Sequence, residues 1–347
     1  MNNTKHISTF AAANGYSGFR SYFHEVFASK DFSKIYVIKG GPGTGKSSLM
    51  KRLLREYAEY AEEAIYCSSD PNSLDGVILS GDGGRVAMLD GTAPHIRDAE
   101  VPGAIDEILN LGEFWDSRWL CAKRERILSL TDEKKKAYKT AYRYLSLAGQ
   151  MKKSEIKAPR ISLRDLAEIV GEIKADEEYK RKTRLISAFG KEGLIRLPTL
   201  TEIADEIIEI RGGERSMLLC NRIAEYLSDN STSHTRFPYA LDGSLTEAIY
   251  IPSCGRAIVC YPPEGKAPAR VIEEVQLYPA PDRTDIERCR VALEFSREME
   301  SEAQRWFSIA SELHFELEEI YSQAMNYSLV DELYAKKSLD ILNIIKS

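Results

Sequence analysis

The chain has 347 residues, enough for two domains, and 43% of them are hydrophobic, as in globular proteins with buried cores. Its net charge of −6 gives no strong nucleic-acid signal, and no apolar run approaches the ~20 residues of a membrane-spanning helix. Six cysteines without a C-x-x-C pair are typical of reduced thiols. We therefore expect a cytoplasmic protein that does not enter a membrane, either a monomer or a homodimer.

A strand, a glycine-rich loop and a helix follow one another near the N-terminus. Residues 35–38 are an unbroken apolar run, which predicts a buried strand. Residues 40–47 match the pattern G-x-x-x-x-G-K-[S/T] of the phosphate-binding (Walker A) loop. Leu49, Met50 and Leu53 then recur at helical spacing, so a helix is expected to begin where the motif ends.

The residues of this loop predict how it would hold a nucleoside triphosphate. Its glycines allow successive N–H groups to converge on phosphate oxygens, and the dipole of the following helix favours an anion. Lys46 is expected to reach the β- and γ-phosphates, and the Ser47 hydroxyl to bind Mg²⁺. The predicted nucleotide-binding residues are Gly40, Gly41, Pro42, Gly43, Thr44, Gly45, Lys46, Ser47 and Ser48.

Acidic residues follow two further predicted strands. Residues 64–67 lead into a polar turn with Asp70, at the strand end where open α/β sheets bind ligands. Residues 85–89 end at Asp90, which is the pattern of the second nucleotide motif, whose carboxylate holds the Mg²⁺ shell. We therefore predict that Ser47 and Asp90 bind the metal ion.

The general base is marked less clearly, because Gly91 follows Asp90 where many motor-type ATPases have a glutamate. Asp70 and His95 are the candidates to position or activate water. Each also has a structural interpretation, Asp70 as the cap of its turn and His95 as the cap of a loop. Together with Lys46 they are the predicted catalytic residues.

The pattern is helical from residue 102 to about residue 184. Pro159 separates a predicted hairpin from a further helix at residues 163–178. Residues 118–160 contain 13 Lys/Arg and four Asp/Glu, a net charge of +9, which leaves the rest of the chain at −15. Such a charge run is usually a solvated helix face, and the alternative is a docking surface for a protein or another anionic partner.

The chain then repeats its first third in a weaker copy. The second loop is three residues shorter than the first, Arg215 replaces Lys46, and Asp90 aligns with Tyr261. Glu214 also places a carboxylate where phosphate would sit. The matching segments are residues 185–189 with 6–10, 207–213 with 35–41, 215–219 with 46–50, 244–249 with 73–78, and 255–259 with 84–88.

These patterns predict an α/β fold of the P-loop NTPase type, a mainly parallel sheet flanked by helices, which is duplicated and carries helical hairpin insertions. The predicted divisions are a P-loop NTPase core at residues 1–112, a helical insertion at 113–183, a degenerate P-loop-like repeat at 184–280 and a C-terminal helical segment at 281–347.

Five segments carry a resemblance to a known family: residues 38–47, 67–76, 90–95, 102–108 and 313–318. On these segments the chain resembles a poorly characterised family of bacterial ATPase-like proteins with two tandem P-loop domains. Members of that family often keep a working loop in both halves, and this chain departs from them in the second. The resemblance implies binding of ATP with Mg²⁺, and hydrolysis.

We therefore expect a Mg²⁺-dependent ATPase with one working site in the N-terminal repeat, with ATP preferred over GTP from the resemblance alone. One alternative is a small-molecule or nucleoside kinase, with Lys123, Arg124 and Arg126 in a cationic lid. Another is an ATP-gated switch or scaffold that turns over slowly. Arg215 or Arg256, from the second half, is a further candidate to reach the first site, and a solvated turn is the alternative for both.

The degenerate second loop predicts that one chain binds one Mg·ATP. Titration calorimetry with a non-hydrolysable ATP analogue is expected to give a stoichiometry near one, because only the first loop has the length and the charges that a triphosphate needs. A stoichiometry of two would show that the second loop binds as well.

Overall fold

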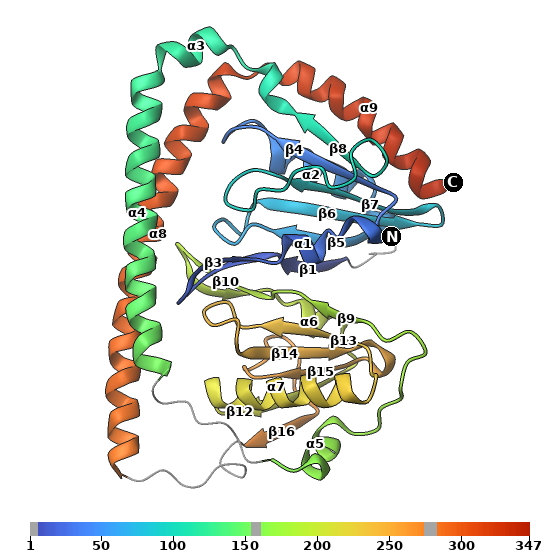
Figure 1. The fold of residues 1–347 in the computed structure, drawn as a ribbon, viewed down its shortest axis with the longest axis vertical. Coiled ribbons are helices and arrows are strands. Elements are labelled where there is room, and N and C mark those ends of the chain that lie inside the picture. Colours follow the sequence, from blue (N-terminus) through green and yellow to red (C-terminus); the bar gives the residue numbers. More distant parts are fainter. Residues whose placement is uncertain (1–5, 154–160, 274–282) are drawn as a thin grey trace.

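The computed structural model describes residues 6–153, 161–273 and 283–347. In it two six-stranded β-sheets lie one beyond the other, and a pair of long helices runs along both (Figure 1). Helices pack on the sheets, so the fold belongs to the α/β class that the sequence predicts. No helix within the described ranges combines the length and hydropathy that crossing a membrane requires.

The first sheet comes from the N-terminal third of the chain. Its strands, in spatial order, are β1 (Ile7–Phe10), β5 (Ala61–Tyr66), β6 (Leu74–Gly81), β7 (Gly84–Asp90), β4 (Lys34–Lys39) and β8 (Asp106–Asn110). β6 is antiparallel to both neighbours, and the other adjacent strands are parallel. Along β4, Tyr36 and Ile38 contact one hydrophobic core while Ile35 and Val37 contact another, so the sheet is buried on both faces.

The second sheet has the same arrangement. Its strands, in the corresponding order, are β9 (Arg181–Thr183), β13 (His234–Pro238), β14 (Thr246–Ile251), β15 (Arg256–Val259), β12 (Glu206–Arg211) and β16 (Arg270–Glu273). β14 is antiparallel to both neighbours, as β6 is, and the other pairs are parallel. Two mixed sheets of mostly parallel strands with one strand order are compatible with a duplicated fold. We call each sheet with its short helices a repeat.

Short helices cover the sheets at equivalent places. α2 (Lys46–Glu56) follows β4 and α7 (Glu214–Asp229) follows β12, and each buries an apolar face against its sheet. The other short helices are α1 (Phe23–Val26), α5 (Leu163–Val170) and α6 (Thr199–Ile203), with 3₁₀ turns at Ser29–Asp31, Ala58–Tyr60, Leu111–Phe114 and Pro252–Cys254.

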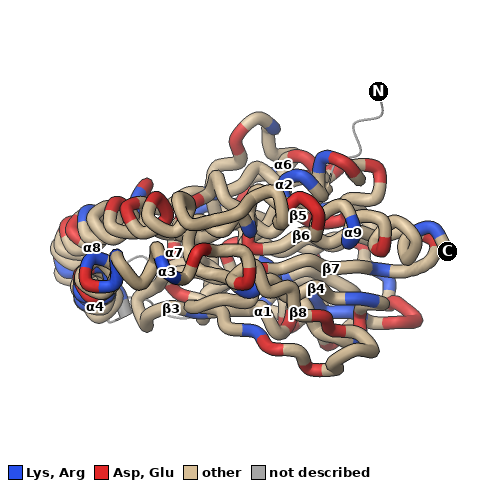
Figure 2. Tube along the Cα trace, turned by 90° about the horizontal axis from the view of Figure 1, so that it is seen from above, with Lys and Arg blue, Asp and Glu red and all other residues tan. Residues whose placement is uncertain are grey.

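Two long helices form a stalk, which we define as α4 (Arg124–Lys153) together with α8 (Arg283–Ala324). They run antiparallel along both repeats, and α3 (Ser117–Ala122) leads into α4 (Figure 1). At ~1.5 Å per residue, α8 is about 63 Å long. Figure 2, which looks down on the stalk from above, shows both basic and acidic residues on it. Ion pairs of Arg126 with Glu316, Lys136 with Asp132 and Lys152 with Glu300 show that part of the predicted basic surface is paired within the molecule.

The stalk differs from the predicted hairpin at residues 113–183. α4 is one continuous helix, and its partner α8 comes from the C-terminal part of the chain. The sequence could not predict this partner, because hydrophobic periodicity shows that a helix has an apolar face but does not show which element covers it. The helix predicted at residues 163–178 ends at Val170, where Gly171 adopts a φ of 73°. Residues 106–110, inside the predicted helical region, instead form β8 at the edge of the first sheet.

The repeats meet where their β-hairpins begin. The N–H groups of Phe10 and Leu185 each donate to the other residue's carbonyl, at 2.8 and 3.1 Å. Phe10 lies five residues before Gly15 and Leu185 five residues before Gly190, the glycines that close the first strand of each hairpin, so the two positions are equivalent. The hairpins are β2 (Ala12–Gly15) with β3 (Gly18–Ser21) and β10 (Ser187–Gly190) with β11 (Gly193–Arg196).

This equivalence corrects the predicted alignment of the repeats. The match of Leu185 with His6 is wrong by four residues, since Leu185 corresponds to Phe10. Short apolar strands without a glycine or proline carry little information about register, so composition alone aligned them badly.

The last helix, α9 (Tyr327–Lys346), returns to the first sheet and completes one of its cores. Val330, Tyr334, Ile341 and Ile345 belong to the same hydrophobic cluster as the buried face of α2. The predicted C-terminal segment is thus divided between the stalk, which contains α8, and the first repeat, which contains α9.

The position of α9 predicts a contrast between two neighbouring residues. Ile341 is fully buried, whereas Leu339 is 61% exposed. Ile341→Ala is expected to lower the free energy of unfolding by about 2–5 kcal/mol through lost burial and a cavity, and Leu339→Ala by less than about 0.5 kcal/mol. Urea unfolding followed by circular dichroism measures both, and equal effects would show that α9 does not pack as described.

Candidate functional site

A turn that we call the glycine loop (residues 40–47) connects β4 to α2. Gly43 and Gly45 adopt left-handed backbone angles, with φ of 68° and 90°, which glycine alone reaches without steric cost. Gly45 is the N-cap of α2, and it supplies no side chain to cap the helix. The loop and the helix N-terminus therefore form a region of positive potential that favours an anion.

Lys46 is the first residue of α2, and its side chain turns back over the loop. Its Nζ donates to the carbonyls of Gly40 (3.1 Å) and Gly41 (2.8 Å) and lies 3.6 Å from Oδ2 of Asp90. Asp90 ends β7, and the parallel pairing of β7 with β4 sets it opposite Ile38. The structure thus brings Lys46 and Asp90 together at the carboxyl ends of two adjacent strands.

The hydroxyl groups of the loop have backbone partners. Thr44 Oγ1 donates to the Gly41 carbonyl, and Ser47 Oγ accepts from the Leu74 N–H, both at 2.9 Å. Thr44 is buried and stabilises the loop, whereas Ser47 is half-buried and Ser48 is exposed. Because Ser47 accepts in that contact, its second lone pair remains for a ligand.

Asp90 is oriented by its own turn. Oδ1 accepts from the N–H and the hydroxyl of Thr92, at 2.9 and 2.6 Å, while Oδ2 faces Lys46. Among the residues that the structure describes, no group of three or more His, Cys, Asp and Glu side chains could hold a metal ion. A divalent cation at Ser47 and Asp90 would therefore take further oxygen ligands from phosphate or water, as Mg²⁺ usually does.

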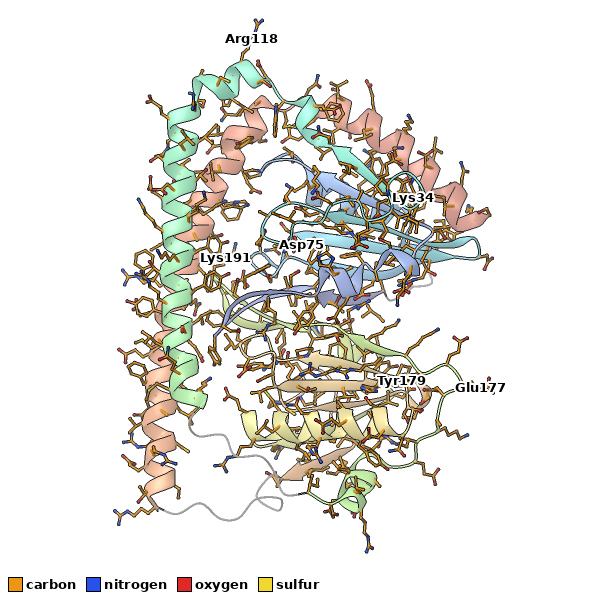
Figure 3. The ribbon with its side chains drawn as sticks, in the orientation of Figure 1. Lys34, Asp75, Arg118, Glu177, Tyr179 and Lys191 are labelled. Atoms are coloured by element: carbon orange, nitrogen blue, oxygen red, sulfur yellow. The ribbon has the colours of Figure 1, made fainter. Side chains whose placement is uncertain are left out.

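Asp70 follows β5 and is engaged on both carboxylate oxygens. Oδ2 accepts from the Ser73 hydroxyl (2.8 Å), and Oδ1 lies 3.6 Å from Nζ of Lys191. Lys191 belongs to the hairpin of the second repeat, and Figure 3 shows it on the side of that hairpin that faces the stalk. Asp70 therefore stabilises its turn and also joins the two repeats, a contact that no local sequence pattern signals.

His95 lies in the interior of the first repeat. Its Nε2 is 3.3 Å from Oδ2 of Asp75, which is also buried, and its ring stacks on Phe23 with the centroids 4.2 Å apart. Burial lowers the pKa of His95, but the hydrogen bond and the charge of Asp75 outweigh it, so the pKa is raised overall. No hydrogen bond or ion pair among the described residues joins His95 to the glycine loop, and we interpret it as a structural group.

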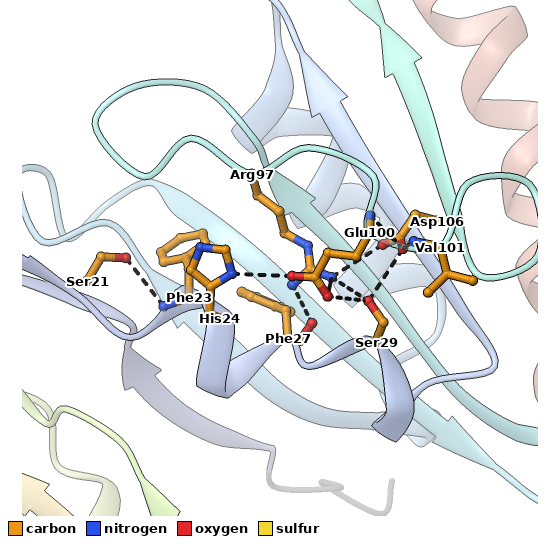
Figure 4. Close-up of polar contacts among 9 residues, drawn as sticks. All are labelled: Ser21, Phe23, His24, Phe27, Ser29, Arg97, Glu100, Val101 and Asp106. Atoms are coloured by element: carbon orange, nitrogen blue, oxygen red, sulfur yellow. Dashed lines mark hydrogen bonds and ion pairs between the residues drawn. The ribbon is translucent and has the colours of Figure 1, made fainter.

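A buried arginine holds the segment that carries His95. Arg97 is 1% exposed and donates to the Ser29 hydroxyl (2.9 Å) and to Asp106 (3.3 Å), as Figure 4 shows. Lys39, the last residue of β4, donates to the Arg97 carbonyl (2.6 Å). Because the buried pair has further hydrogen bonds, it can stay charged, and it fixes this segment beside the strand that enters the glycine loop.

The C-terminal helices form one wall of the glycine loop. Tyr327 Oη donates to the Gly43 carbonyl (2.8 Å). The Tyr321 ring lies 3.2 Å from the place where a Cβ on Gly41 would be, and the Glu318 carbonyl oxygen lies 2.3 Å from the place of a Cβ on Gly43. A side chain at residue 43 would therefore collide with the backbone of α8.

Three ionisable side chains of the stalk gather beside this wall. Nζ of Lys134 lies 3.2 Å from Nδ1 of His314, whose Nε2 lies 3.6 Å from Oε1 of Glu318. Burial, Lys134 and Lys46 together lower the pKa of His314 to about 4, so its ring is neutral at pH 7. Burial raises the pKa of Glu318, and the N–H of Gly43 and the charge of Lys46 oppose that shift. In the sequence, only the i, i+4 spacing of His314 and Glu318 on a helix marks this cluster.

The corresponding place in the second repeat is filled by the protein's own charges. Nζ of Lys152, on α4, lies 3.1 Å from Glu214 at the N-terminus of α7 and 2.8 Å from Glu300 on α8. Tyr16, from the hairpin of the first repeat, donates to Glu300 at 2.7 Å. In the second repeat these paired groups lie between the stalk and the N-terminus of α7, the place that corresponds to the glycine loop of the first repeat.

Strand register corrects a second detail of the predicted alignment. In the first sheet Ile38 of β4 lies opposite Asp90 of β7, and in the second sheet Glu209 of β12 lies opposite Val259 of β15. Ile210 is the residue that aligns with Ile38, and it follows Glu209. The position of Asp90 therefore corresponds to Cys260, which follows Val259, and not to Tyr261. Cys260 Sγ lies 3.1 Å from Cys220 Sγ, and this contact, together with burial, raises the pKa of the Cys220 thiol. The second repeat still has no carboxylate at this position.

Several predicted basic residues are engaged away from the glycine loop. Arg256 donates to Glu206 (2.6 Å) within the second repeat. Arg126 pairs with Glu316 on the stalk, and Lys123 lies over a tryptophan ring, 5.6 Å from its centroid. The structure therefore does not bring Arg256 to the first site, and it places Arg126 and Lys123 in helix contacts of their own.

Comparisons of the chain with protein-family models, with curated proteins and with solved structures find no significant match. What the glycine loop binds must therefore be inferred from its own geometry.

Two glycines with similar backbone angles predict different effects of alanine. Gly43 and Gly103 have φ of 68° and 77°, so alanine costs about 1–2 kcal/mol of backbone strain at either place. Only at residue 43 would the new Cβ also meet α8, since nothing lies within 4 Å at Gly103. We expect Gly43→Ala, but not Gly103→Ala, to speed hydrogen exchange in the last turns of α8. Unchanged exchange in both variants would contradict the contact between loop and stalk.

Proposed function

We propose that the chain is a P-loop nucleoside triphosphatase, a Mg²⁺-dependent protein that binds and hydrolyses ATP at one site in the first repeat. The observation that carries the proposal is the position of Lys46, folded over a glycine loop and 3.6 Å from Asp90 at the end of the adjacent strand. A loop lysine, a strand-end carboxylate and a helix N-terminus are the parts that P-loop enzymes combine around a Mg-triphosphate.

The donors of the site suit a triphosphate. The loop N–H groups and the Lys46 ammonium would hold the phosphates, and the Ser47 hydroxyl and the Asp90 carboxylate would orient Mg²⁺. Bound Mg·ATP would supply the scissile phosphoanhydride and a metal ion that neutralises its charge. Lys46 presently donates to the carbonyls of Gly40 and Gly41, which are weaker acceptors than phosphate, so its side chain is free to exchange partners.

The second repeat supports a single site. Its loop is three residues shorter, and Lys152 is already paired with Glu214 and Glu300 there. An entering phosphate would meet two carboxylates and would have to break this buried ion pair, which is costly.

A second candidate function is an ATP-gated switch that turns over slowly. It is favoured by the positions of both predicted bases, because Asp70 is engaged with Ser73 and Lys191 while His95 is paired with Asp75 in the interior. A carboxylate already bound on both oxygens activates water less well than a free one. Hydrolysis at this site is therefore expected to be slow without a partner.

Replacing Lys46 tests the site directly. Lys46→Ala is expected to abolish turnover and to weaken Mg·ATP binding by at least about 10-fold. The substitution removes a charged donor to the phosphates, and a tenfold change in Kd requires the loss of only about 1.4 kcal/mol. Lys51→Ala, on the exposed face of the same helix, is the matched control. ATP turnover and titration of a fluorescent ATP analogue measure the two effects.

The outcomes separate the candidate functions. Turnover that is lost in Lys46→Ala and kept in Lys51→Ala supports the ATPase. Binding that depends on Lys46 in a protein without turnover supports the switch, and ADP release only with an added acceptor supports a kinase. Binding and turnover that survive Lys46→Ala would overturn the proposed site.

A further inference from the structure

The tip of each hairpin places one side chain on the opposite repeat. The turn between β2 and β3 begins with Tyr16, and the turn between β10 and β11 begins with Lys191. Each of them directly follows the glycine that closes the first strand of its hairpin, so the two residues are equivalent. Their contacts can therefore be compared across the repeats.

In the second repeat, the tip side chain lies close to the N-terminus of the helix that follows the shortened loop. Tyr16 Oη accepts from Nζ of Lys152 (2.7 Å), and the same Nζ lies 3.1 Å from Glu214, the first residue of α7. Tyr16 Oη also donates to Glu300 at 2.7 Å. The tip of the first hairpin is therefore one ion pair away from the place that corresponds to the glycine loop.

Lys191 makes the corresponding approach to the first repeat. Its Nζ lies 3.6 Å from Oδ1 of Asp70, whose Oδ2 accepts from the Ser73 hydroxyl. The next residue, Leu74, donates its N–H to the Ser47 hydroxyl at 2.9 Å, so the turn that holds Lys191 is bonded to the start of α2. The second repeat thus brings a cation beside the serine that is predicted to bind Mg²⁺.

The backbone of this hairpin turn is held from two sides. Gln304 and Ser308, both on α8, donate to the Lys191 carbonyl at 3.1 and 3.4 Å. On the other side, a Cβ on Gly190 would lie 3.3 Å from the carbonyl oxygen of Ser68, in the turn that follows β5. Because the backbone is held and lysine has a flexible four-carbon stem, Nζ can change its partner while the hairpin stays in place.

A phosphate would be a stronger partner for this ammonium group than its present ones. The 3.6 Å contact with Asp70 is longer than the ~2.7–2.9 Å of a charge-assisted hydrogen bond, and Nζ lies 4.9 Å from the centroid of the Phe315 ring. Loop amides of a P-loop surround the α- and β-phosphates, which leaves the γ-phosphate accessible to a cation from outside the loop. Asp70 would keep its hydrogen bond from Ser73 if Lys191 left it.

We propose that Lys191 is a phosphate-binding residue of the first site, supplied by the second repeat, which exchanges Asp70 for the γ-phosphate of bound Mg·ATP. The inference rests on the proposed function and adds to it a residue that distinguishes ATP from ADP. It also gives the second repeat, whose own loop is three residues shorter, a part in nucleotide binding.

The test compares the two partners of this ion pair. Lys191→Ala is expected to raise the Kd for a non-hydrolysable Mg·ATP analogue about 10-fold, and the Kd for Mg·ADP less than about threefold, because ADP lacks the γ-phosphate. Lys191→Arg keeps the charge and is expected to stay within about threefold of the unsubstituted protein. Asp70→Asn is expected to leave the Kd for the analogue unchanged or to lower it, since it removes the carboxylate that competes for Lys191.

The matched control removes a lysine from another part of the second repeat. Lys182 is exposed on β9, and Lys182→Ala is expected to leave both Kd values within about twofold. Calorimetry measures the Kd values, and thermal unfolding checks that every variant folds.

The outcomes distinguish this inference from the proposed function. If the unsubstituted protein binds the analogue and Lys191→Ala binds it within about twofold, Lys191 does not contact phosphate, although the nucleotide site stands. If Asp70→Asn weakens binding as much as Lys191→Ala does, the ion pair acts by joining the repeats, and the inference fails. Equal losses for the analogue and for ADP would overturn the contact with the γ-phosphate. If the unsubstituted protein binds neither nucleotide, the proposed function fails, and the inference fails with it.

Discussion

The paired hydrogen bonds between Phe10 and Leu185 hold the two repeats together at equivalent positions, and much of the remaining geometry depends on this arrangement. Beside them Arg184 donates to the buried Glu63 at 2.7 Å, so the junction also contains a charge pair that either repeat alone would leave unsatisfied. Each hairpin then extends onto the opposite repeat. The surroundings of each loop are therefore completed by residues from the other half of the chain.

The two repeats have the same strand order, but their loops make different contacts. At the second repeat a shortened loop leaves room for Glu214, and the charges of Lys152 and Glu300 are satisfied within the protein. At the first repeat α2 begins with Lys46, which lies 3.6 Å from Asp90, whereas α7 in the second repeat begins with Glu214. The two repeats thus share one strand order and differ at the start of the helix that follows β4 or β12, where the second loop is three residues shorter.

Local features of the fold and the site could be predicted, because they depend on residues that are adjacent in sequence. The strand Lys34–Lys39, the glycine loop and the helix after it are of this kind. Contacts between elements that are far apart in the sequence could not be predicted. These include the pairing of α4 with α8, the contact of Lys191 with Asp70 and the contact of the Glu318 backbone with Gly43. His95 follows a strand as an exposed residue would, yet Phe23 and Asp75 enclose it. The repeat was visible, but its register was wrong by four residues before the first hairpin and by one residue in the segment that contains Gly255.

The placement of α9 has a consequence for the order in which the protein can assemble. Ile341 and Ile345 belong to the core of the first sheet, yet they follow the whole second repeat in the chain. A ribosome that has made the first sheet must still make some two hundred residues before the covering layer exists, at about 5–20 residues per second. The six strands of the second sheet all lie within residues 181–273 and can pair earlier. During synthesis the first sheet therefore keeps an apolar face uncovered until α9 has been made.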